Sequence, residues 1–375
     1  MSKNQIYFNS SPSHTIGVEL ELQILDKNTL ELSPGAPKIL KDNSGDLRIK
    51  EELLDSIIEI NTNICNTIDD VRTDLSKTLK KVLKSADKYN LCLLSMGTHP
   101  YSHWADQIIS NHPRYHNLIN RFQWPLRRLL ITGVHVHIGV NSGEKAIAIT
   151  NGLVRYIPHF IGLSANSPIN DKEVTGLAST RTKIFESMPT AGLPESMRNY
   201  SEFQNFMKTL QKAHTIESIR EVWWDIRPHP KFGTVEIRLF DSVPTLECII
   251  QLAAFTQALV ATMSNHYDNG TQLPLLDNWI NQENKWRATR YGIDADIIKN
   301  KNGTQISLKS SIIETIEKII PVAVNLNCDK ELYELLNNLE HDTPWFKKQL
   351  EIFEKTKDLK KLIHNFVNIF KKSII

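Results

Sequence analysis

The sequence is poor in the features that mark the most easily recognised classes of protein. Four cysteines in 375 residues, Cys65, Cys92, Cys248 and Cys328, stand far apart, and none belongs to a C-x-x-C pair. A disulfide framework and a zinc–thiolate site are therefore not expected, whereas reduced cysteines in a reducing compartment are. With 15 glycines and 16 prolines, the chain has too few of either for a fibrous or disordered protein.

An excess of charge of one sign is also lacking. Lysine and arginine number 44, aspartate and glutamate 42, and the formal net charge is +2. A protein that coats nucleic acid has a strong basic excess, so no nucleic-acid partner is expected. The 41% of hydrophobic and 23% of charged residues are typical of a folded globular protein with a sizeable core.

Long hydrophobic runs are missing as well. The first residues, MSKNQIYFNSSPSHT, contain no apolar segment of the signal-peptide kind. The most apolar stretch, 248–263, is shorter than the ~20 residues that span a bilayer, and polar residues interrupt it. We therefore expect no membrane association and a cytoplasmic location.

Several well-known local motifs are absent. GVNSGEK at 139–145 has the wrong glycine spacing for a P-loop. No G-x-G-x-x-G follows a strand, and neither H-E-x-x-H nor G-x-S-x-G occurs. P-loop, Rossmann, zincin and α/β-hydrolase chemistry thus have no local support.

The segments that are present indicate a mixture of strands and helices. Alternation with a period of two predicts strands, and a period of 3.6 predicts helices. Because strands and helices mix without strict βαβ alternation, we expect an α+β fold with a largely antiparallel sheet. The expected strands are 17–25, 57–62, 91–98, 134–140 and 234–240; the expected helices are 69–89, 359–370 and one with Pro244 in its first turn that runs to about 263; the expected loops are 265–272 and 300–304.

Four of the strands carry an unusual set of side chains opposite their apolar face. A solvated face is one explanation, but such faces usually carry lysine, and these strands have none. Carboxylates repel one another unless a cation lies between them, and carboxylate oxygens with a histidine suit Mg²⁺ or Mn²⁺. With an arginine nearby, the pattern indicates a metal site and is compatible with a magnesium–nucleotide phosphate site that lacks a P-loop. The side chains concerned are Glu19, Glu21, Glu59, His135, His137, Glu236 and Arg238.

In combination, these segments resemble the type-2 glutamate–cysteine ligase family, and within it the YbdK-like carboxylate–amine ligases. No single segment is specific, but the combination is, and it spans about residues 15–295. The matching segments are GVELEL (17–22), IIEINT (57–62), MGTHP (96–100), GVHVHIGV (133–140), NSP (166–168), TRTKIFESMPTAGLP (180–194), DIRPHPKFGTVEIRLFD (225–241) and ENKWRATRYGID (283–294).

The resemblance implies a fold and a reaction. It implies a glutamine-synthetase-like fold whose antiparallel sheet lines the active-site cleft, with helices on its other face. We expect one catalytic domain, 1–375, with a family-like part at about 15–295 and a helical C-terminal part at about 305–375. The implied reaction is ATP-dependent ligation of a small carboxylate or amino acid to an amine through an acyl phosphate, with glutamate and cysteine as one candidate pair. Members of the family are often dimeric, so a homodimer is suggested.

The resemblance also implies roles for individual residues. The positions that match metal-binding places are Glu19, Glu21, Glu59, His137 and Glu236, with Mg²⁺ as the expected ion and Mn²⁺ as the alternative. Arg238 matches an arginine that contacts the transferred phosphate of ATP, and with Glu236 it is the expected catalytic pair. Arg181, Arg198 and Arg227 are candidate substrate-binding residues. Arg181 is the preferred one of the three, whereas Arg198 and Arg227, like Lys285, could equally form structural ion pairs.

Two other functions stay open from the sequence. One is a metal-dependent hydrolase with glutamate and histidine ligands, although no local zinc motif supports it. The other is a non-catalytic relative that binds a nucleotide or amino acid, although every expected ligand position holds a competent residue. Of the neighbouring residues, His135 is expected to hydrogen-bond a ligand side chain rather than bind metal. Glu52 is expected on the solvated surface, and a turn role for His99 is as well supported as a functional one.

Overall fold

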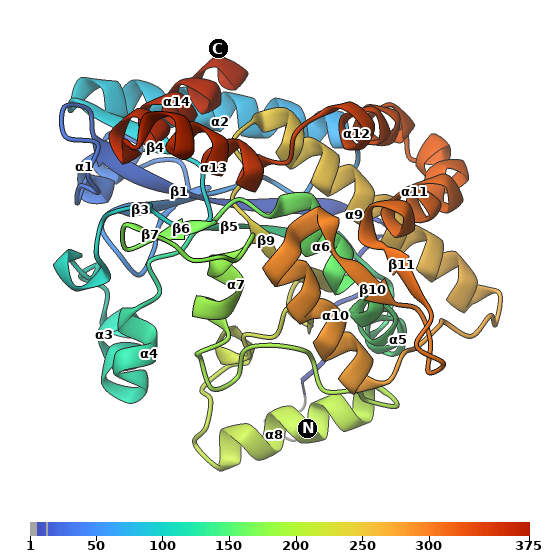
Figure 1. Cartoon of the computed structure of the whole chain (residues 1–375). Helices are drawn as coiled ribbons and strands as arrows, with labels where there is room; N and C mark the ends of the chain where they lie inside the picture. Colours follow the sequence, from blue (N-terminus) through green and yellow to red (C-terminus); the bar gives the residue numbers. More distant parts are fainter. Residues whose placement is uncertain (1–5, 13) are drawn as a thin grey trace.

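The alternating segments form strands of one antiparallel sheet, because each has an apolar face to bury and pairs its backbone with a neighbouring strand. The computed structural model describes residues 6–12 and 14–375, and the sheet lies at its centre (Figure 1). Its strand order is β2-β3-β1-β5-β9-β8, and β4 also pairs with β1. The strands are β1 (Ile16–Asp26), β2 (Ile49–Glu51), β3 (Ile57–Asn61), β4 (Leu91–Leu94), β5 (Gly133–Gly139), β8 (Ile226–His229) and β9 (Thr234–Asp241); separate hairpins pair β6 (Ile169–Asn170) with β7 (Glu173–Val174) and β10 (Asp296–Ile298) with β11 (Gln305–Ser307).

Helices surround this sheet. The α-helices are α1 (Ala36–Asp42), α2 (Ile68–Lys88), α3 (Pro113–Phe122), α4 (Trp124–Arg127), α5 (Gly143–Leu153), α6 (Ile157–Ser164), α7 (Thr180–Phe185), α8 (Tyr200–Lys212), α9 (Leu246–Asp268), α10 (Asn278–Tyr291), α11 (Leu308–Asn325), α12 (Asp329–His341), α13 (Trp345–Thr356) and α14 (Leu359–Ile374). Short 3₁₀ turns lie at Trp104–Asp106, Val154–Tyr156, Ile219–Glu221 and Gly292–Asp294.

The apolar face of the sheet packs on α2, α9 and the C-terminal helices, which lie above the sheet in Figure 1. Leu20 of β1, Val136 of β5 and Ile237 of β9 are fully buried in this core, together with Leu79 of α2 and Phe255 of α9. Each such side chain contributes roughly 1.5–3 kcal/mol when it leaves water. Burial of this face therefore fixes which side of every strand carries the polar residues.

The helix α2 has the ends that its sequence favours. The Thr67 hydroxyl accepts a hydrogen bond from the Asp70 amide (3.2 Å), and the Asp70 carboxylate accepts one from the Thr67 amide (2.9 Å). This capping box satisfies two amides that a helix start leaves unpaired. The predicted stripe on this helix, which includes Val71 and Leu75, is buried, as is most of the stripe on α14.

The helix α9 corrects two expectations. It begins at Leu246 with Thr245 as its N-cap, so Pro244 precedes the helix instead of lying in its first turn. It continues to Asp268, so the first half of the expected loop 265–272 is helical. This 23-residue helix is long and apolar enough to cross a membrane by length and composition. However, 83% of its apolar 18-residue segment is buried inside the protein, as in a core helix. The other expected loop, 300–304, is confirmed as the turn between β10 and β11.

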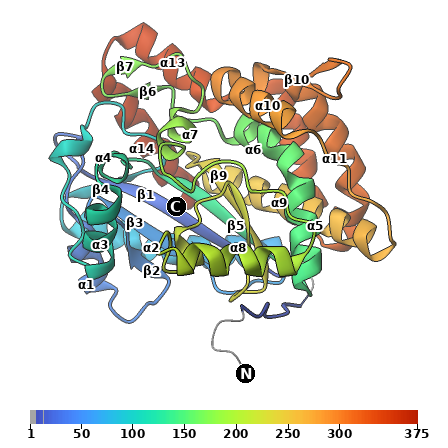
Figure 2. The same cartoon turned by 90° about the horizontal axis from the view of Figure 1, so that it is seen from below.

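The opposite face of the sheet is enclosed rather than solvated. Figure 2 looks toward this face and shows β1, β5 and β9 framed by α3, α4, α7 and α8. His135, His137 and Glu236 on this face are at most 7% exposed. The alternative interpretation, a solvent-facing side of the sheet, is therefore wrong. The buried polar side chains must form hydrogen bonds or ion pairs with one another or with a ligand.

Candidate active site

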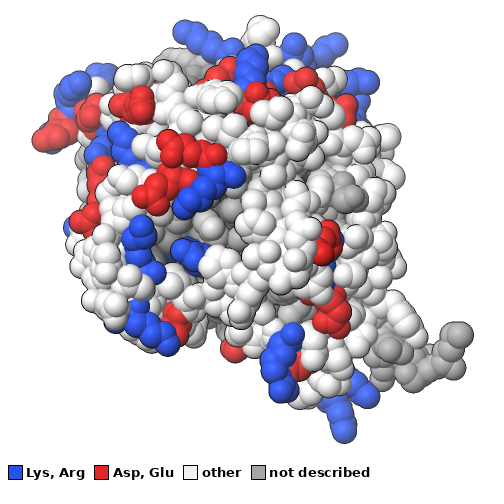
Figure 3. All heavy atoms as spheres, turned by 90° about the vertical axis from the view of Figure 1, so that its right-hand side faces the viewer, with Lys and Arg blue, Asp and Glu red and all other residues white. Residues whose placement is uncertain are grey.

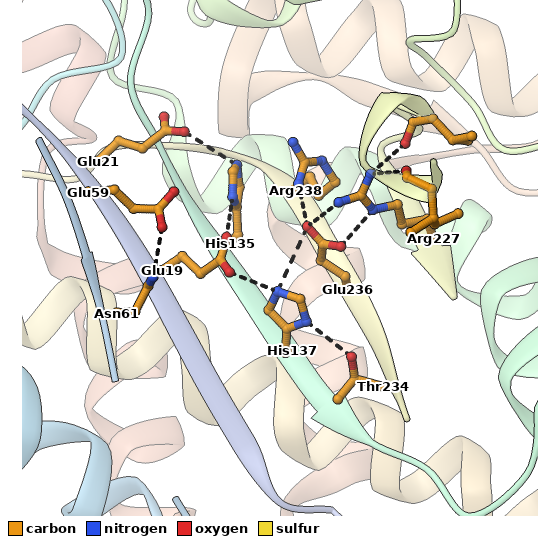
Figure 4. Close-up of polar contacts among 12 residues, drawn as sticks. Glu19, Glu21, Glu59, Asn61, His135, His137, Arg227, Thr234, Glu236 and Arg238 are labelled. Carbon is orange, nitrogen blue, oxygen red and sulfur yellow. Dashed lines mark hydrogen bonds and ion pairs between the residues drawn. The ribbon is translucent and has the colours of Figure 1, made fainter. Parts of the chain in front are cut away.

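Strand register brings the polar side chains of the enclosed face together. Glu19 of β1 pairs directly with His135 of β5, and His137 pairs directly with Glu236 of β9. Directly opposed residues on one face of an antiparallel pair have Cβ atoms about 4.5–5.5 Å apart. In Figure 4 the side chains of these residues converge on one region above the three strands.

Glu19, His137 and Glu236 form a group of ligand atoms that all lie within 4.8 Å of one another. The Nε2 atom of His137 is 3.4 Å from Glu19 Oε1 and 3.8 Å from Glu236 Oε1. Its Nδ1 atom hydrogen-bonds the Thr234 hydroxyl at 3.0 Å, which orients the ring. Nε2 is buried and has no hydrogen-bond partner within the described part of the chain. Two carboxylates and an unpaired imidazole nitrogen at this spacing fit a divalent cation.

The electrostatics of the group keep its carboxylates charged. Burial alone would raise the pKa of Glu19, but the hydrogen bond from His135 and the nearby His137 ring outweigh it and hold that pKa well below its usual range. Burial likewise opposes ionisation of Glu236, yet Arg227, Arg238 and His137 hold its pKa well below the usual range. Both oxygen donors are thus available as anions at neutral pH.

Two arginines contact Glu236, and they do so in different ways. Arg227 donates through Nε to Glu236 Oε2 (2.7 Å) and through its second terminal nitrogen to Oε1 (3.3 Å). Its first terminal nitrogen donates to the carbonyls of Ile219 (2.7 Å) and Val222 (2.8 Å). Arg238 forms an ion pair with Glu236 through one terminal nitrogen, while its buried Nε has no hydrogen-bond partner among the described residues. Arg227 therefore positions Glu236, whereas Arg238 keeps donor capacity for a ligand.

Arg181 is a second buried arginine with unused donors. One terminal nitrogen donates to the Arg238 carbonyl at 3.1 Å, and Nε has no partner in the described ranges. Burial lowers the pKa of Arg181 despite nearby Asp241 and Glu21. The approach requires a glycine at position 133, because a Cβ there would clash with the guanidinium. A buried guanidinium with free donors suits a carboxylate or phosphate.

A hydrogen-bonded network holds the helix that carries Arg181. The Asp241 carboxylate accepts from the Asn166 amide (2.9 Å) and from the hydroxyls of Ser167 (2.6 Å) and Ser179 (2.7 Å). The Ser167 hydroxyl in turn accepts from the Arg181 amide at 3.1 Å. The NSP and TRT segments of the sequence thus act together as a positioning device, a role that the sequence analysis did not assign.

Glu21 and Glu59 lie outside the three-residue group and form a second acidic cluster. They pair directly across β1 and β3. Glu59 accepts from the Asn61 side chain (2.7 Å), and Glu21 accepts from the Gly133 amide (2.7 Å). Glu52, expected on the solvated surface, belongs to this cluster: burial, together with the charges of Glu59 and Glu21, raises its pKa well above the usual range. The three-residue strand β2 beside it was too short to give a sequence signal.

Three further residues were assessed from the sequence. Arg198 is not brought to the site: its side chain is 87% exposed and pairs with Glu202 one helical turn away. His135 contacts Glu19 through Nδ1 at 3.1 Å, as expected of a residue that orients a ligand side chain. His99 has the turn role, because its Nδ1 accepts the Ser102 amide (2.9 Å) and its Nε2 bonds the Leu30 carbonyl (3.2 Å).

The fold is shared with known ligases. A glutamate–cysteine ligase from Francisella tularensis, solved in complex with AMP, matches with a TM-score of 0.71 at 14% identity, covering 98% of this chain and 89% of that one. A bifunctional glutathione synthetase from Pasteurella multocida matches with a TM-score of 0.72 at 12% identity, covering 96% and 52%. The expected glutamine-synthetase-like α+β fold is confirmed.

Sequence relatives then define the family. The model of glutamate–cysteine ligase family 2 matches residues 15–344. A Frankia alni protein named "Putative glutamate--cysteine ligase 2-1" is 44% identical over 342 residues, 90% of each chain, and a Thermobifida fusca protein named "Putative glutamate--cysteine ligase 2" is 41% identical over 372 residues, 98% and 93%. The chain belongs to glutamate–cysteine ligase family 2. It is an ATP-dependent carboxylate–amine ligase, which confirms the first interpretation of the sequence over a metal-dependent hydrolase.

Proposed function

We propose that this ligase activates the carboxylate of glutamate with ATP and joins it to a primary amine, with cysteine as the first amine to test. The observation that carries the proposal is the enclosed sheet face, where the Glu19–His137–Glu236 group lies beside Arg238 and Arg181. Anionic cation ligands and unpaired guanidinium donors on one face suit a reaction in which a phosphoryl group passes between two oxygens.

We propose Mg²⁺, replaceable by Mn²⁺, as the ion held by Glu19, His137 and Glu236. Such an ion would supply positive charge that neutralises the phosphates of ATP. The second acidic cluster, Glu21 and Glu59 with the added Glu52, is proposed to hold a further cation. This assignment is supported by the direct pairing of Glu21 with Glu59 and by burial, which together with the charges of Glu59 and Glu21 raises the pKa of Glu52, although Lys50 already lies 3.3 Å from Glu59.

The protein's own residues have separate tasks in this scheme. Arg238 contacts the terminal phosphoryl group of ATP during its transfer. The phosphoryl group bonds to a carboxylate oxygen of glutamate, its bond to ADP breaks, and an acyl phosphate forms. Arg181 is proposed to hold the anionic substrate, since its buried Nε has no partner among the described residues while a terminal nitrogen, bonded to the Arg238 carbonyl, keeps the guanidinium beside Arg238. The amine nitrogen then bonds to the acyl carbon, the carbon–oxygen bond to phosphate breaks, and the amine proton passes to water or phosphate. Arg227 keeps Glu236 in place and is assigned to positioning rather than to substrate.

The remaining expectations are part of the same proposal. A single catalytic domain is supported by α13, whose Gln349 donates to the Asn166 carbonyl (2.8 Å) next to the site. A reducing, cytoplasmic location is supported by four free cysteines. A homodimer is proposed from the resemblance to the family.

The test is phosphate release by the purified protein with ATP, Mg²⁺, glutamate and cysteine, with mass spectrometry of the product. Release that requires both co-substrates and an amide product one water lighter than their sum is the expected result. Release without any amine, or hydrolysis products without ATP, would favour a hydrolase. ATP binding without turnover would favour the non-catalytic alternative.

A further inference from the structure

A cavity of 690 Å³ lies beside the sheet site, and none of the residues assigned to that site lines it. Its wall includes α10, the end of α5, the loop 191–196 and α7. The helix α7 separates the two spaces: its Arg181 reaches the Arg238 carbonyl, while its Lys183 lines the cavity. Figure 3 shows the side of the molecule on which α5 and α10 lie, where the surface is hollowed and charges of both signs are mixed.

Direct contacts connect the cavity wall to β9, the strand that carries Glu236 and Arg238. Lys285 lines the cavity, and its ammonium is 2.6 Å from both Glu186 Oε1 and Asp225 Oδ2. The side chains of Lys285 and Asp225 are 4% and 3% exposed. The Asp225 carbonyl accepts the Arg238 amide at 2.9 Å. A molecule in the cavity therefore lies one layer of side chains away from the residue proposed to contact the phosphoryl group.

The lining offers unpaired acceptors, which suit a donor group on the ligand. Asn281 Oδ1 and Thr289 Oγ1 are buried and have no hydrogen-bond partner among the residues the structure describes. Glu195 forms no ion pair with any described residue, and it lines the same cavity. Buried acceptors without donors are costly, so a ligand that supplies N–H groups gains affinity here.

The lining also offers one carboxylate to a positive charge. Lys183 and Lys285 are both paired with Glu186, and Lys285 also with Asp225 behind the wall, which leaves Glu195 without an ion pair among the described residues. Trp286 is 43% exposed on the wall, and the Lys183 ammonium already lies 5.7 Å from its ring centroid. An aromatic face attracts ammonium groups, so a cationic ligand suits this wall.

We infer that this cavity binds the amine substrate, and that the amine is larger than cysteine and carries a second, positively charged group. A volume of 690 Å³ is typical of sites for ligands well above the size of one small amino acid. The reactive amine of the ligand extends past the Glu186–Lys285–Asp225 contact into the sheet site, where its nitrogen bonds to the acyl carbon. The second amine meets Glu195, Asn281 and the Trp286 ring. The inference rests on the proposed function, of which it specifies the amine.

The experiment measures steady-state phosphate release with ATP, Mg²⁺ and glutamate, using cysteine, lysine and spermidine as amines. At least one of lysine and spermidine, each of which carries more than one amino group, is expected to exceed cysteine about tenfold in kcat/KM. Trp286→Ala and Glu195→Gln are expected to raise the KM for that amine about tenfold and to leave the KM values for ATP and glutamate within twofold. The matched controls are Trp279→Ala, on the same helix and 56% exposed, and Glu173→Gln, an exposed carboxylate, neither of which lines the cavity.

Each other outcome overturns the inference in a distinguishable way. If cysteine is the best amine, the claim of a larger substrate is wrong. If the cavity variants raise the KM for ATP instead, the cavity receives the nucleotide. If they behave like their controls, the cavity has no substrate role. If the parent protein releases no phosphate with glutamate and any of the three amines, the proposed function itself has failed and this inference with it.

Discussion

The two arginines on Glu236 make opposite predictions for the same substitution. Arg227 donates hydrogen bonds to protein acceptors, namely both Glu236 oxygens and the carbonyls of Ile219 and Val222. Arg238 has one protein ion pair and an unpartnered buried Nε. Arg227→Lys is therefore expected to lose stability, whereas Arg238→Lys is expected to keep stability and lose rate.

The magnitudes follow from the contacts. A lysine at 227 retains one charged contact at best, and the two carbonyls lose their donor at about 1–3 kcal/mol each. Breaking a buried ion-pair network costs about 3–5 kcal/mol, which for a cooperative unit of 375 residues lowers Tm by roughly 4–6 °C. Arginines in phosphoryl transfer contribute on the order of 10³-fold or more, so Arg238→Lys is expected to lower kcat roughly 10²–10³-fold with Tm within about 1 °C.

Thermal unfolding and steady-state phosphate release on the two purified variants provide the test. The reasoning is refuted if Arg238→Lys lowers Tm as much as Arg227→Lys does. It is equally refuted if Arg238→Lys has a kcat within a few-fold of the parent, because the arginine would then serve only as the salt-bridge partner of Glu236.

The remaining predictions concern residues around the site. Arg198→Ala is expected to leave every KM within twofold, because its side chain pairs with Glu202 on the surface; a tenfold change would return it to the substrate site. Thiol alkylation at pH 7.5 is expected to leave turnover intact, since burial raises the pKa of the cysteines, that of Cys328 to about 12; loss of turnover that ATP prevents would contradict this. Saturating ATP with Mg²⁺ is expected to raise Tm, and EDTA to cancel the shift; no shift would argue against nucleotide binding. Burial lowers the pKa of His99 to about 3, so the contribution of neutral His99 to stability is complete above pH 6.5 and falls by about 1.4 kcal/mol per pH unit below that pH. His99→Gln is therefore expected to reduce the slope of unfolding free energy against pH by that amount between about pH 6 and 4. An unchanged slope would refute this reasoning.

The strands and their polar faces were predictable because a period of two is a local property. Glu19 and Glu21 alternate with buried leucines in β1, and the same alternation placed His137 and Glu236 on the same face as each other. The bulge between β5 and β9 was not predictable, because it depends on pairing: two residues of β9, Arg238 and Leu239, stand where β5 has only one.

The parts of the site that depend on distant segments escaped the sequence analysis. Glu52 joins the second acidic cluster only because β2 pairs with β3, and no periodicity in three residues indicates that. Arg227 and Arg198 are equivalent as candidates in the sequence, yet one is fully paired inside the sheet site and the other lies in solvent. The 690 Å³ cavity forms only where α5, α7 and α10 come together in space, and the local sequence pattern of each helix does not predict that.

The central claim is that the enclosed sheet face is a cation-dependent ligase site built on Glu19, His137 and Glu236. The most direct test is a crystal structure with Mn²⁺ and a non-hydrolysable ATP analogue, with data collected to locate manganese by anomalous scattering. The account predicts a manganese peak in contact with His137 Nε2 and a carboxylate oxygen from each of Glu19 and Glu236, with the analogue's terminal phosphate next to Arg238. Nucleotide and manganese bound elsewhere, or a group left without metal while the analogue is fully bound, would contradict it.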